Sequence, residues 1–445
     1  MNLIIFTPAN TGSAIGRMAA LVTHELVAQG CRVTVVRTEV KPLLTTNTHD
    51  FGTLIIPWND EALVLELILN ADAIIYHIGD NFDFHEGGVR WLADFPGLVC
   101  LHDFFLGHLF YCWAEKYRSP AQTVLEHWYG IEAAGQFFGF PDGESFIEGT
   151  REITPMTEWI CSQADGVITH SHWGCDRVLN SCSGPVRVVP LAYDAPIRAA
   201  NASDTASAEA ITLKLLTIGN VNSNKRVSSV IQAIGRSHLL KQRVTYRLVG
   251  AVSPDMKTTL TELAAQLGVK LLISGQVDDE KLEYVITESD VISSLRWPAL
   301  EAASASAIEA MLYGKAVMVT DTGFYAEIPD PCVIKIKQTD EIGHIQSSLE
   351  ALLEDQDRIL CIGTEAQHWA SQTFTAQNYA EQLIDAISHI SRTTPAKNAI
   401  NNFCKILQGW STDGLLLSTD ELIHPLHIFE SINQEMATKE GPENC

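Results

Sequence analysis

Two glutamates, Glu301 and Glu309, stand two helical turns apart in a segment that suits a phosphorylated ligand. Glu301 falls in a loop after a strand-like run, and the helix carrying Glu309 is expected to begin near Ser304. The first N–H groups of a helix have no internal partner and carry positive partial charge, so this helix start could bind a diphosphate. Ser304 could cap the helix or touch a phosphate oxygen, and Glu309 could accept bonds from a ribose diol. Such pairs also occur on solvated helix faces, so the pattern alone is a hypothesis.

Two cations, Lys225 and Arg226, follow a strand-like run and the turn residues Gly219 and Asn220. They fall at the expected start of another helix, where positive charge opposes the helix dipole, so a merely solvated position is slightly disfavoured. In a site without a metal ion, the two charges could neutralise a pyrophosphate leaving group. We therefore predict that this turn belongs to the same ligand site.

Polar residues in the first half of the chain directly follow two strand-like runs in the sequence. His77, Asp80 and His85 follow one run, and His102 and Asp103 end another. Asp103 could orient the ring of His102 or contact a substrate hydroxyl. Metal binding is a second interpretation, although the spacings match no compact metal motif, and plain hydrogen bonding at strand ends is a third.

A loop of small residues follows the first strand-like run near the N-terminus. It contains Gly12, where the absence of a side chain permits close approach of the backbone to a ligand. Arg17, a few residues later, could supply a nearby cation.

The elements that must position these residues form two alternating series of strands and helices, which is typical of parallel sheets covered by helices. In the first half we expect strands at 2–6, 32–36, 73–76, 98–101, 166–169 and 186–189, a helix at 14–28 and a helical insertion at about 104–160. In the second half we expect strands at 214–218, 244–249, 270–273, 290–293 and 316–319, with helices at 226–238, 254–267, 279–287 and 304–313.

The chain thus divides into two α/β domains of similar size, 1–195 and 213–392. The small, polar stretch 196–212 lacks hydrophobic periodicity and is the predicted linker. The extension 393–445 is polar and receives no role. Two such domains predict a cleft between them, with ligands at the carboxyl ends of the strands.

The segment Arg296-Trp-Pro-Ala-Leu-Glu301-Ala-Ala-Ser304, with Glu309 and the loop Asp321-Thr-Gly-Phe-Tyr-Ala-Glu327, resembles the donor signature of glycosyltransferase family 4. It is closest to a bacterial subgroup with an Arg-x-Pro-x-x-Glu-x-x-Ser version. The resemblance covers roughly residues 1–390 and implies the GT-B fold, in which two Rossmann-like domains with doubly wound parallel sheets face each other across a cleft. A helical run near 374–390 is similar to the family's closing segment, which returns towards the first domain.

The resemblance also implies roles for individual residues. Glu301 would contact the donor sugar with Arg296 beside it, and Glu309 would bind the ribose hydroxyls. Lys225 and Arg226 would hold the diphosphate. The remaining implied contacts are backbone recognition of the base around Gly275 and Val277, a donor-side place for Asn220 where many relatives carry Arg, and a position of His102 beside the transferred sugar. The implied reaction is sugar transfer with retention of configuration, without a metal ion or cofactor, from a nucleotide-sugar substrate to an unidentified acceptor.

The composition limits the partners of the chain. A formal net charge of −24 over 445 residues excludes broad contact with nucleic acid or an anionic membrane surface, although a small basic patch would still allow peripheral membrane contact. There is no apolar run of the ~18–20 residues needed for a membrane span and no signal-peptide pattern. The ten cysteines form no CxxC pair, so we expect reduced thiols in a cytoplasmic protein. The oligomeric state stays open.

Two alternatives remain open at this stage. A nucleotide-sugar epimerase could share the fold and donor site and would isomerise the donor without an acceptor. A non-catalytic protein could bind a nucleotide or a partner protein through the same scaffold, an option favoured by Asn220 and by Leu300, which replaces the usual glycine before the first glutamate. Asp355-Gln-Asp357 is the one match to the metal-binding Asp-x-Asp signature, but it lies in a charged helical stretch and is interpreted as a solvated face.

Overall fold

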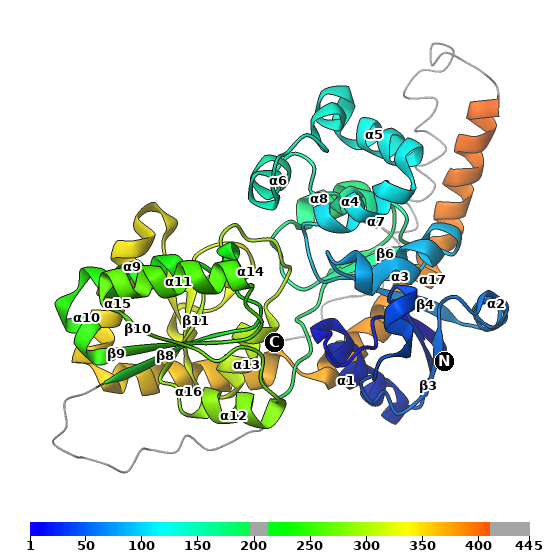
Figure 1. Cartoon of the computed structure of the whole chain (residues 1–445). Coiled ribbons are helices and arrows are strands. Elements are labelled where there is room, and N and C mark those ends of the chain that lie inside the picture. Colours follow the sequence, from blue (N-terminus) through cyan, green and yellow to red (C-terminus); the bar gives the residue numbers. More distant parts are fainter. Residues whose placement is uncertain (196–211, 410–445) are drawn as a thin grey trace, which may run out of the picture.

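The computed structural model describes residues 1–195 and 212–409, which form two α/β domains side by side (Figure 1). The first contains a seven-stranded sheet in the order β3-β2-β1-β4-β5-β6-β7, and the second a six-stranded sheet in the order β10-β9-β8-β11-β12-β13. All paired strands are parallel. Each sheet starts at an inner strand, winds to one edge and returns to fill the other side. This confirms the predicted pair of doubly wound, Rossmann-like domains.

The strands agree closely with the runs of Val, Ile and Leu in the sequence. In the first sheet they are β1 Asn2–Thr7, β2 Arg32–Arg37, β3 Leu54–Pro57, β4 Ala73–Ile78, β5 Leu98–Leu101, β6 Gly166–Thr169 and β7 Val186–Val188. In the second they are β8 Leu213–Ile218, β9 Val244–Val249, β10 Lys270–Ile273, β11 Val291–Ser294, β12 Ala316–Thr320 and β13 Val333–Ile336. β3 and β13 were not expected. Both are four-residue edge strands, too short to show a clear pattern.

Helices connect the strands and cover both sheets. Those of the first half are α1 Ala14–Ala28, α2 Glu61–Leu69, α3 Phe82–Asp94, α4 Gly107–Lys116, α5 Arg118–Gln136, α6 Gly143–Thr150, α7 Thr157–Cys161 and α8 Cys175–Ser181. Those of the second half are α9 Val227–Arg236, α10 His238–Arg243, α11 Pro254–Leu267, α12 Asp279–Thr287, α13 Ala305–Leu312, α14 Gly323–Glu327, α15 Glu341–Glu354, α16 Gln356–Thr373 and α17 Ala376–Gly409. Side-chain caps fix several starts, such as Ser13 at α1 and Asp278 at α12.

The predicted helical insertion is present as α4 to α7. Figure 1 shows α5 and α6 standing above the first sheet, apart from the helices that cover it. Aromatic side chains give this part its own core: the ring centroid of Phe110 lies 5.5 Å from that of Phe137 and 4.9 Å from that of Trp159. The ring of Phe146 packs 5.2 Å from that of Phe137.

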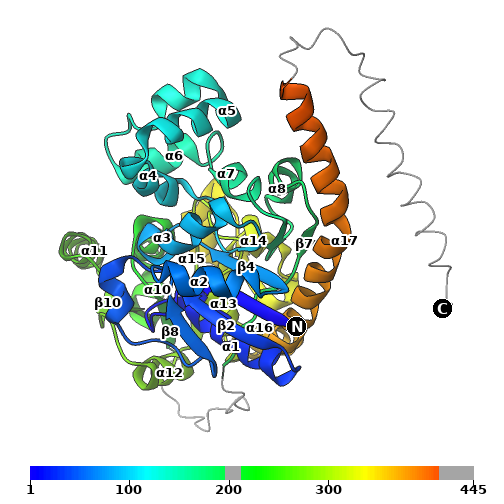
Figure 2. The same cartoon turned by 90° about the vertical axis from the view of Figure 1, so that its right-hand side faces the viewer.

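The long helix α17 leaves the second domain and packs on α1, β5 and β6 of the first domain (Figure 2). Lys397, in the second half of this helix, donates to the Asp165 carboxylate at 2.8 Å. The predicted boundary at residue 392 therefore lies inside one continuous helix. Almost all of the predicted linker, and the predicted extension beyond residue 409, lie outside the described residues.

A single apolar cluster continues from the first domain into the second. It contains Leu3 and Ile75 from the first sheet, Leu216 and Ile308 from the second domain, and Tyr379 from α17. All five side chains are fully buried. In the part of the chain that the structure describes, no helix is long and apolar enough to cross a membrane.

Candidate active site

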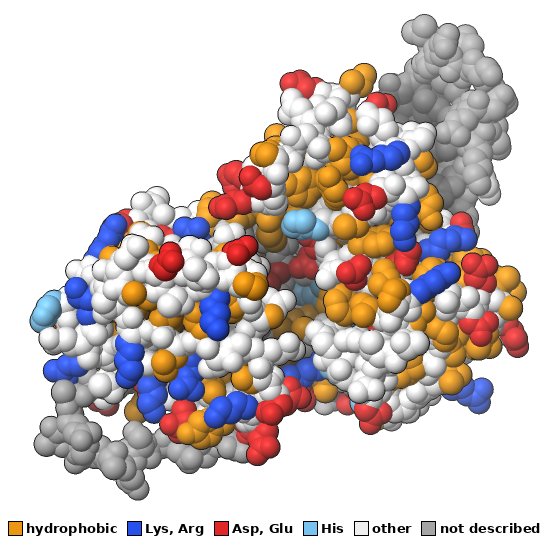
Figure 3. Space-filling view, viewed as in Figure 1, with side chains coloured by type: hydrophobic (Ala, Val, Ile, Leu, Met, Phe, Trp, Pro, Cys, Tyr) orange, Lys and Arg blue, Asp and Glu red, His pale blue; other side chains and the backbone are white. Residues whose placement is uncertain are grey.

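Most predicted site residues lie on loops that leave the inner strands of the two sheets, whereas Arg17 and Glu309 lie on helices α1 and α13, and Gly275 and Val277 follow the edge strand β10. The pairs β1 and β4, and β8 and β11, are the places where the winding direction of each sheet reverses, and ligands of such folds bind beyond the carboxyl ends of these strands. Figure 3 shows a hollow between the domains in which acidic and histidine side chains gather. A cavity of about 220 Å³ there is lined by Asp80, Asp103, Phe105, Asn220, Asn222, Asn224, Lys225, Arg296, Leu300 and Glu301.

The loops that carry Asp103 and Glu301 are paired across the domain boundary. The two residues form an isolated antiparallel bridge, and the Ala302 N–H donates to the His102 carbonyl at 2.9 Å. The Leu300 carbonyl accepts from the N–H groups of Phe104 and Phe105 at 2.9 and 3.0 Å. A predicted residue from each domain is therefore held at one place by backbone hydrogen bonds.

The Glu301 carboxylate is fixed by two neighbours from its own domain. The Arg296 Nε lies 3.4 Å from its Oε1, and the Tyr325 hydroxyl donates to the same oxygen. Arg296 is itself buried and donates to the Leu295 carbonyl at 2.8 Å. Ser304 is the N-cap residue of α13, but its side chain makes no capping hydrogen bond, which leaves the helix start without a side-chain cap.

Of the two predicted phosphate cations, the structure brings one into the cavity. Lys225 is buried, lines the cavity and donates to the Ile218 carbonyl. Burial and the nearby Arg296 lower the pKa of Lys225 to about 7. Gly219 (φ +88°) lies directly beside it, because an added Cβ there would be 2.7 Å from the Lys225 Nζ.

Arg226 does not line this cavity, so its predicted place on the diphosphate is not supported by the geometry. Its side chain donates to both carboxylate oxygens of Glu341, with Nε to Oε1 at 2.9 Å and Nη2 to Oε2 at 2.7 Å. Such a two-point pair fixes the guanidinium on the start of α15. Asn220 does line the cavity, beside Lys225.

Arg17 and Glu309 meet across the cleft, away from this cavity. The Arg17 Nη1 lies 3.6 Å from the Glu309 Oε1, and the same guanidinium donates to the Tyr193 hydroxyl at 3.2 Å and the Asp194 carboxylate at 3.1 Å. Burial raises the pKa of Glu309, although the Arg17 charge opposes this effect. The structure therefore joins a predicted donor residue of each domain.

The remaining predicted donor residues do not line the cavity. The Gly12 N–H donates to the Asn10 side chain at 2.7 Å. The Gly275 carbonyl accepts from the Gly250 N–H at 2.8 Å, and Val277 packs against the apolar cluster shared by the domains. These contacts neither support nor contradict the predicted donor-binding roles of the three residues.

Four buried histidines, His77, His85, His102 and His170, lie behind the cavity. The Nδ1 of His77 is 2.9 Å from the Nε2 of His102, and the rings of His102 and His170 are 4.8 Å apart. Burial, reinforced for His77 and His102 by neighbouring imidazoles, lowers the pKa of His77 and His85 to about 3 and that of His170 to about 4. The pKa of His102 also falls well below its usual value, so all four rings are neutral at pH 7.

The unpartnered nitrogens of this cluster indicate which atoms carry the protons. The Nε2 of His77 is buried without a hydrogen-bond partner. A buried N–H without an acceptor costs more than a bare lone pair, so the His77 proton belongs on Nδ1 and is donated to the Nε2 of His102. The proton of His102 then sits on its own Nδ1. Among residues 1–195 and 212–409, no three His, Cys, Asp or Glu side chains are grouped so that they could hold a metal ion.

Asp103 is the carboxyl group of the cavity best suited to exchange a proton. Its Oδ2 accepts from the Asp80 N–H at 2.8 Å, and Asp80 in turn accepts from the His108 Nδ1 at 2.5 Å and the Leu109 N–H at 2.9 Å. Burial, followed by the nearby charge of Asp80, raises the pKa of Asp103 to about 7. A carboxyl group that titrates near neutral pH can act as a general acid or base.

Several contacts of the site escaped the sequence analysis. Tyr325 on Glu301 and His170 behind His102 were not selected. His170 could have been found, because it follows β6 just as His102 follows β5, and neighbouring parallel strands end at the same edge.

Comparisons with known proteins agree with this geometry. The family model described as glycosyl transferases group 1 matches residues 212–369. Comparison with curated proteins gave no match. Among solved structures, HepE of Anabaena in complex with UDP and glucose is similar over 87% of this chain and 99% of its own, with a TM-score of 0.57 and 16% identity. Residues 212–369 thus match the group 1 glycosyltransferases, and the chain as a whole has the GT-B fold.

Two further solved structures show the same fold at similarly low identity. Sucrose-phosphate synthase from Thermosynechococcus elongatus is 15% identical over 89% of this chain and 100% of its own, with a TM-score of 0.57. A glycosyltransferase from Rickettsia africae is 15% identical over 87% of this chain and 98% of its own, with a TM-score of 0.58. The matched segment 212–369 contains Lys225, Glu301 and Glu309.

Proposed function

We propose that this glycosyltransferase transfers a sugar from a nucleoside diphosphate sugar to a hydroxyl acceptor, with retention of configuration and without a metal ion. The observation that carries the proposal is the cavity between the domains, where Lys225, Arg296 and Glu301 of the donor side face Asp103 of the other side. The UDP complex of the similar HepE structure makes UDP the first nucleotide to test.

The donor diphosphate would lie against Lys225 and the start of α13. Lys225 and Arg296 supply two positive charges, and the helix start adds free N–H groups, which together can stabilise a departing diphosphate. Glu301 would accept bonds from hydroxyls of the transferred sugar while Arg296 and Tyr325 hold its carboxylate in place. Glu309, opposite Arg17, would take the ribose hydroxyls.

In the proposed transfer step, the bond between the anomeric carbon and the diphosphate oxygen breaks as the acceptor oxygen bonds to the same face of the sugar. The ionised Asp103 carboxylate would orient the acceptor hydroxyl, and the proton of that hydroxyl passes to the departing diphosphate oxygen. The chain's own part is to position both substrates, stabilise the separating charges and exclude water. Neutral His102, with its proton on Nδ1, would donate a hydrogen bond rather than carry charge.

Calorimetry with UDP, GDP, ADP and TDP, on the wild type and on Lys225→Met and Glu309→Gln, tests the donor site. We expect one nucleotide to bind and both substitutions to weaken it by about tenfold or more. The anomeric configuration of a product, assigned by proton NMR, tests retention. Binding of no nucleotide would contradict the donor site, and isomerisation of the donor without an acceptor would favour an epimerase.

A further inference from the structure

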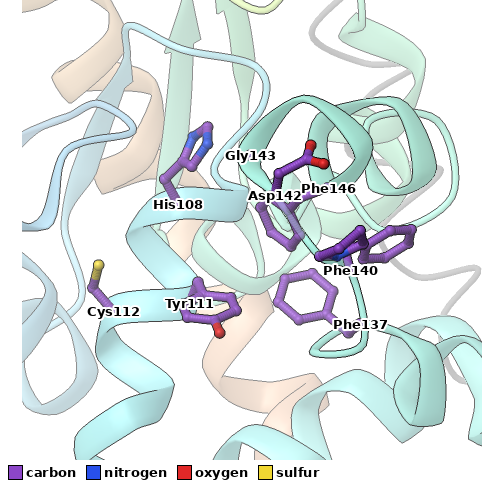
Figure 4. A pocket seen from close by; sticks show the side chains of 9 residues that line it. His108, Tyr111, Cys112, Phe137, Phe140, Asp142, Gly143 and Phe146 are labelled. Atoms are coloured by element: carbon purple, nitrogen blue, oxygen red, sulfur yellow. The ribbon is translucent and has the colours of Figure 1, made fainter. Parts of the chain in front are cut away.

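The helical insertion contains a second cavity, separate from the cleft. Its volume is about 290 Å³, and it lies between α4 and the turn that leads into α6 (Figure 4). Four aromatic rings form much of its wall: Tyr111, Phe137, Phe140 and Phe146. Figure 4 shows these rings grouped on one side and His108 at another edge. The predicted donor and catalytic residues take no part in this cavity.

One hydrogen-bonded pair connects this cavity to the cleft. His108 lines the aromatic cavity, Asp80 lines the cleft cavity, and the His108 Nδ1 lies 2.5 Å from the Asp80 Oδ2. Phe105 also borders the cleft, and its ring centroid is 5.4 Å from that of His108. A molecule in the aromatic cavity is therefore two residues, His108 and Asp80, away from Asp103, the candidate catalytic carboxylate of the cleft.

The walls select an uncharged aromatic occupant. The rings of Phe137 and Phe146 meet edge to face at 87°, which leaves ring edges and faces to receive another aromatic group. Acidic side chains stand where α6 begins: Asp142 lines the cavity and caps the helix through the Ser145 N–H at 2.8 Å, and Glu144 lies in the first turn. These charges disfavour an anionic ligand.

The size of the cavity sets the size of the group that fits. An apolar cavity of about 150 Å³ takes up benzene, so a volume of about 290 Å³ suits a group of about two rings. A bare sugar would find few hydrogen-bond partners among these side chains. Its hydroxyls are better served by the polar cleft.

We propose that this cavity is an acceptor subsite, which binds the uncharged aromatic part of an acceptor whose hydroxyl reaches the cleft beside Asp103. The assignment of the occupant as an acceptor rests on the proposed function. The binding of an aromatic group in the cavity is testable without it.

The rate of Cys112 alkylation reports whether the cavity is occupied, because this exposed thiol lines the cavity. We would follow its alkylation by N-ethylmaleimide with peptide mass spectrometry, in the presence of 2-naphthyl glycosides or the methyl glycosides of the same sugars. We expect the naphthyl compounds to protect Cys112 and to bind about tenfold or more tightly than the methyl compounds. Exposed Cys361, far along the chain in α16, serves as an internal control that neither ligand protects.

The substitution Gly143→Phe is designed to narrow the cavity. Gly143 lines it, and a Cβ added there meets nothing within 4 Å, so a ring can be added without displacing backbone. Gly135→Phe is the matched control, because its Cβ also meets nothing and it does not line the cavity. We expect Gly143→Phe to abolish protection by naphthyl glycosides and Gly135→Phe to preserve it, with UDP affinity the same in both.

The outcomes separate this proposal from the proposed function. Equal binding of naphthyl and methyl glycosides, or protection that survives Gly143→Phe, would overturn the subsite. Absence of binding of all four nucleotides to the wild type would contradict the donor site while leaving the Cys112 result intact. Transfer to the naphthyl glycosides that is weakened by Gly143→Phe alone would support both.

Discussion

The backbone of Asp103 pairs with that of Glu301, so a candidate catalytic carboxylate from each domain sits at a single junction between them. The side chain of Leu300, next to Glu301, packs against the apolar cluster of the first domain, and its carbonyl accepts two N–H groups from that domain. Glu327 makes a second link, accepting from the N–H groups of His172 at 3.0 Å and Trp173 at 2.7 Å. These contacts join the two domains beside the site.

Leu300 occupies the position before Glu301 where glycosyltransferase family 4 usually has a glycine. In the structure its side chain helps to dock the second domain against the first. We expect Leu300→Ala to lower the melting temperature by an amount that corresponds to about 1 kcal/mol, because the side chain is only half-buried. The KM for the donor should rise several-fold as this arrangement of the two domains is populated less. Leu179→Ala, at a leucine that is 57% exposed, is the control. Indistinguishable behaviour of the two variants would contradict the docking role.

The contact between Arg17 and Glu309 couples the two domains at the predicted ribose site. We expect Glu309→Gln to weaken donor binding by about tenfold to a hundredfold, and Arg17→Met to weaken it less, because Arg17 also pairs with Asp194. A double-mutant cycle should give a coupling energy of about 1 kcal/mol. Glu341→Gln, which removes the partner of Arg226 outside the cavity, should leave donor affinity unchanged. A loss of donor affinity there would return Arg226 to the site.

The pKa of Lys225 predicts how donor binding depends on pH. Since burial lowers this pKa to about 7, the ammonium is charged below pH 7 and neutral above it in the free enzyme. A diphosphate needs the charged form, so UDP affinity should fall as the pH rises from 7 to 9, by up to about tenfold per pH unit. Calorimetry in buffers of different ionisation enthalpy should detect proton uptake above pH 7. In Lys225→Met this proton uptake should be lost.

The arrangement of the two sheets could be predicted from the sequence because their inner strands are continuous runs of branched apolar residues. β6, β9 and β10 begin and end where the sequence placed them. The edge strand β3 could not be found, because it ends in Pro57 and its residue Leu54 is 58% exposed, so the usual contrast with polar neighbours is missing.

The sequence predicted which loops carry the site residues, but not which side chains those residues contact. Lys225 and Glu301 follow the neighbouring strands β8 and β11, which end at one edge of the second sheet, and Asp103 follows β5 of the first sheet, so each loop is placed by topology. The partners of their side chains are not. Arg226 pairs with Glu341 more than a hundred residues later, and Tyr325 reaches Glu301 from a separate helix. Such pairs depend on how whole elements pack, so they could not be predicted from local spacing in the sequence.

The donation from His77 to His102 makes His77 a positioning residue. Without it, the Nε2 of His102 loses its partner and the ring can rotate or change tautomer. We expect His77→Leu to lower kcat by about tenfold or more with little change in donor KM. Asn places an N–H donor near the position of Nδ1, so His77→Asn should retain more of the activity. Selective 15N labelling of histidine should show the proton of His102 on Nδ1 in the wild type, and a proton on Nε2 would contradict this arrangement.

Burial raises the pKa of the Asp103 carboxyl group to about 7, and the ionised form therefore lowers the stability of the fold at high pH. Its pKa is about 7 in the folded protein, above the value of about 4 expected in the unfolded chain, so the folded state binds the proton more tightly. The stabilisation from this proton is complete below about pH 4 and is lost as the pH rises to about 7, with an upper limit of about 4 kcal/mol. Asp103→Asn should therefore melt at a higher temperature than the wild type at pH 8 and at nearly the same temperature at pH 4.5. The amide oxygen can still accept from the Asp80 N–H, so the fold should survive, while transfer activity should fall by about a hundredfold. Asp321→Asn, at an exposed carboxylate, is the control for a change of charge alone. A variant at Asp103 that is no more stable than the wild type at pH 8 would show that the carboxyl group is solvated and ionised at little cost.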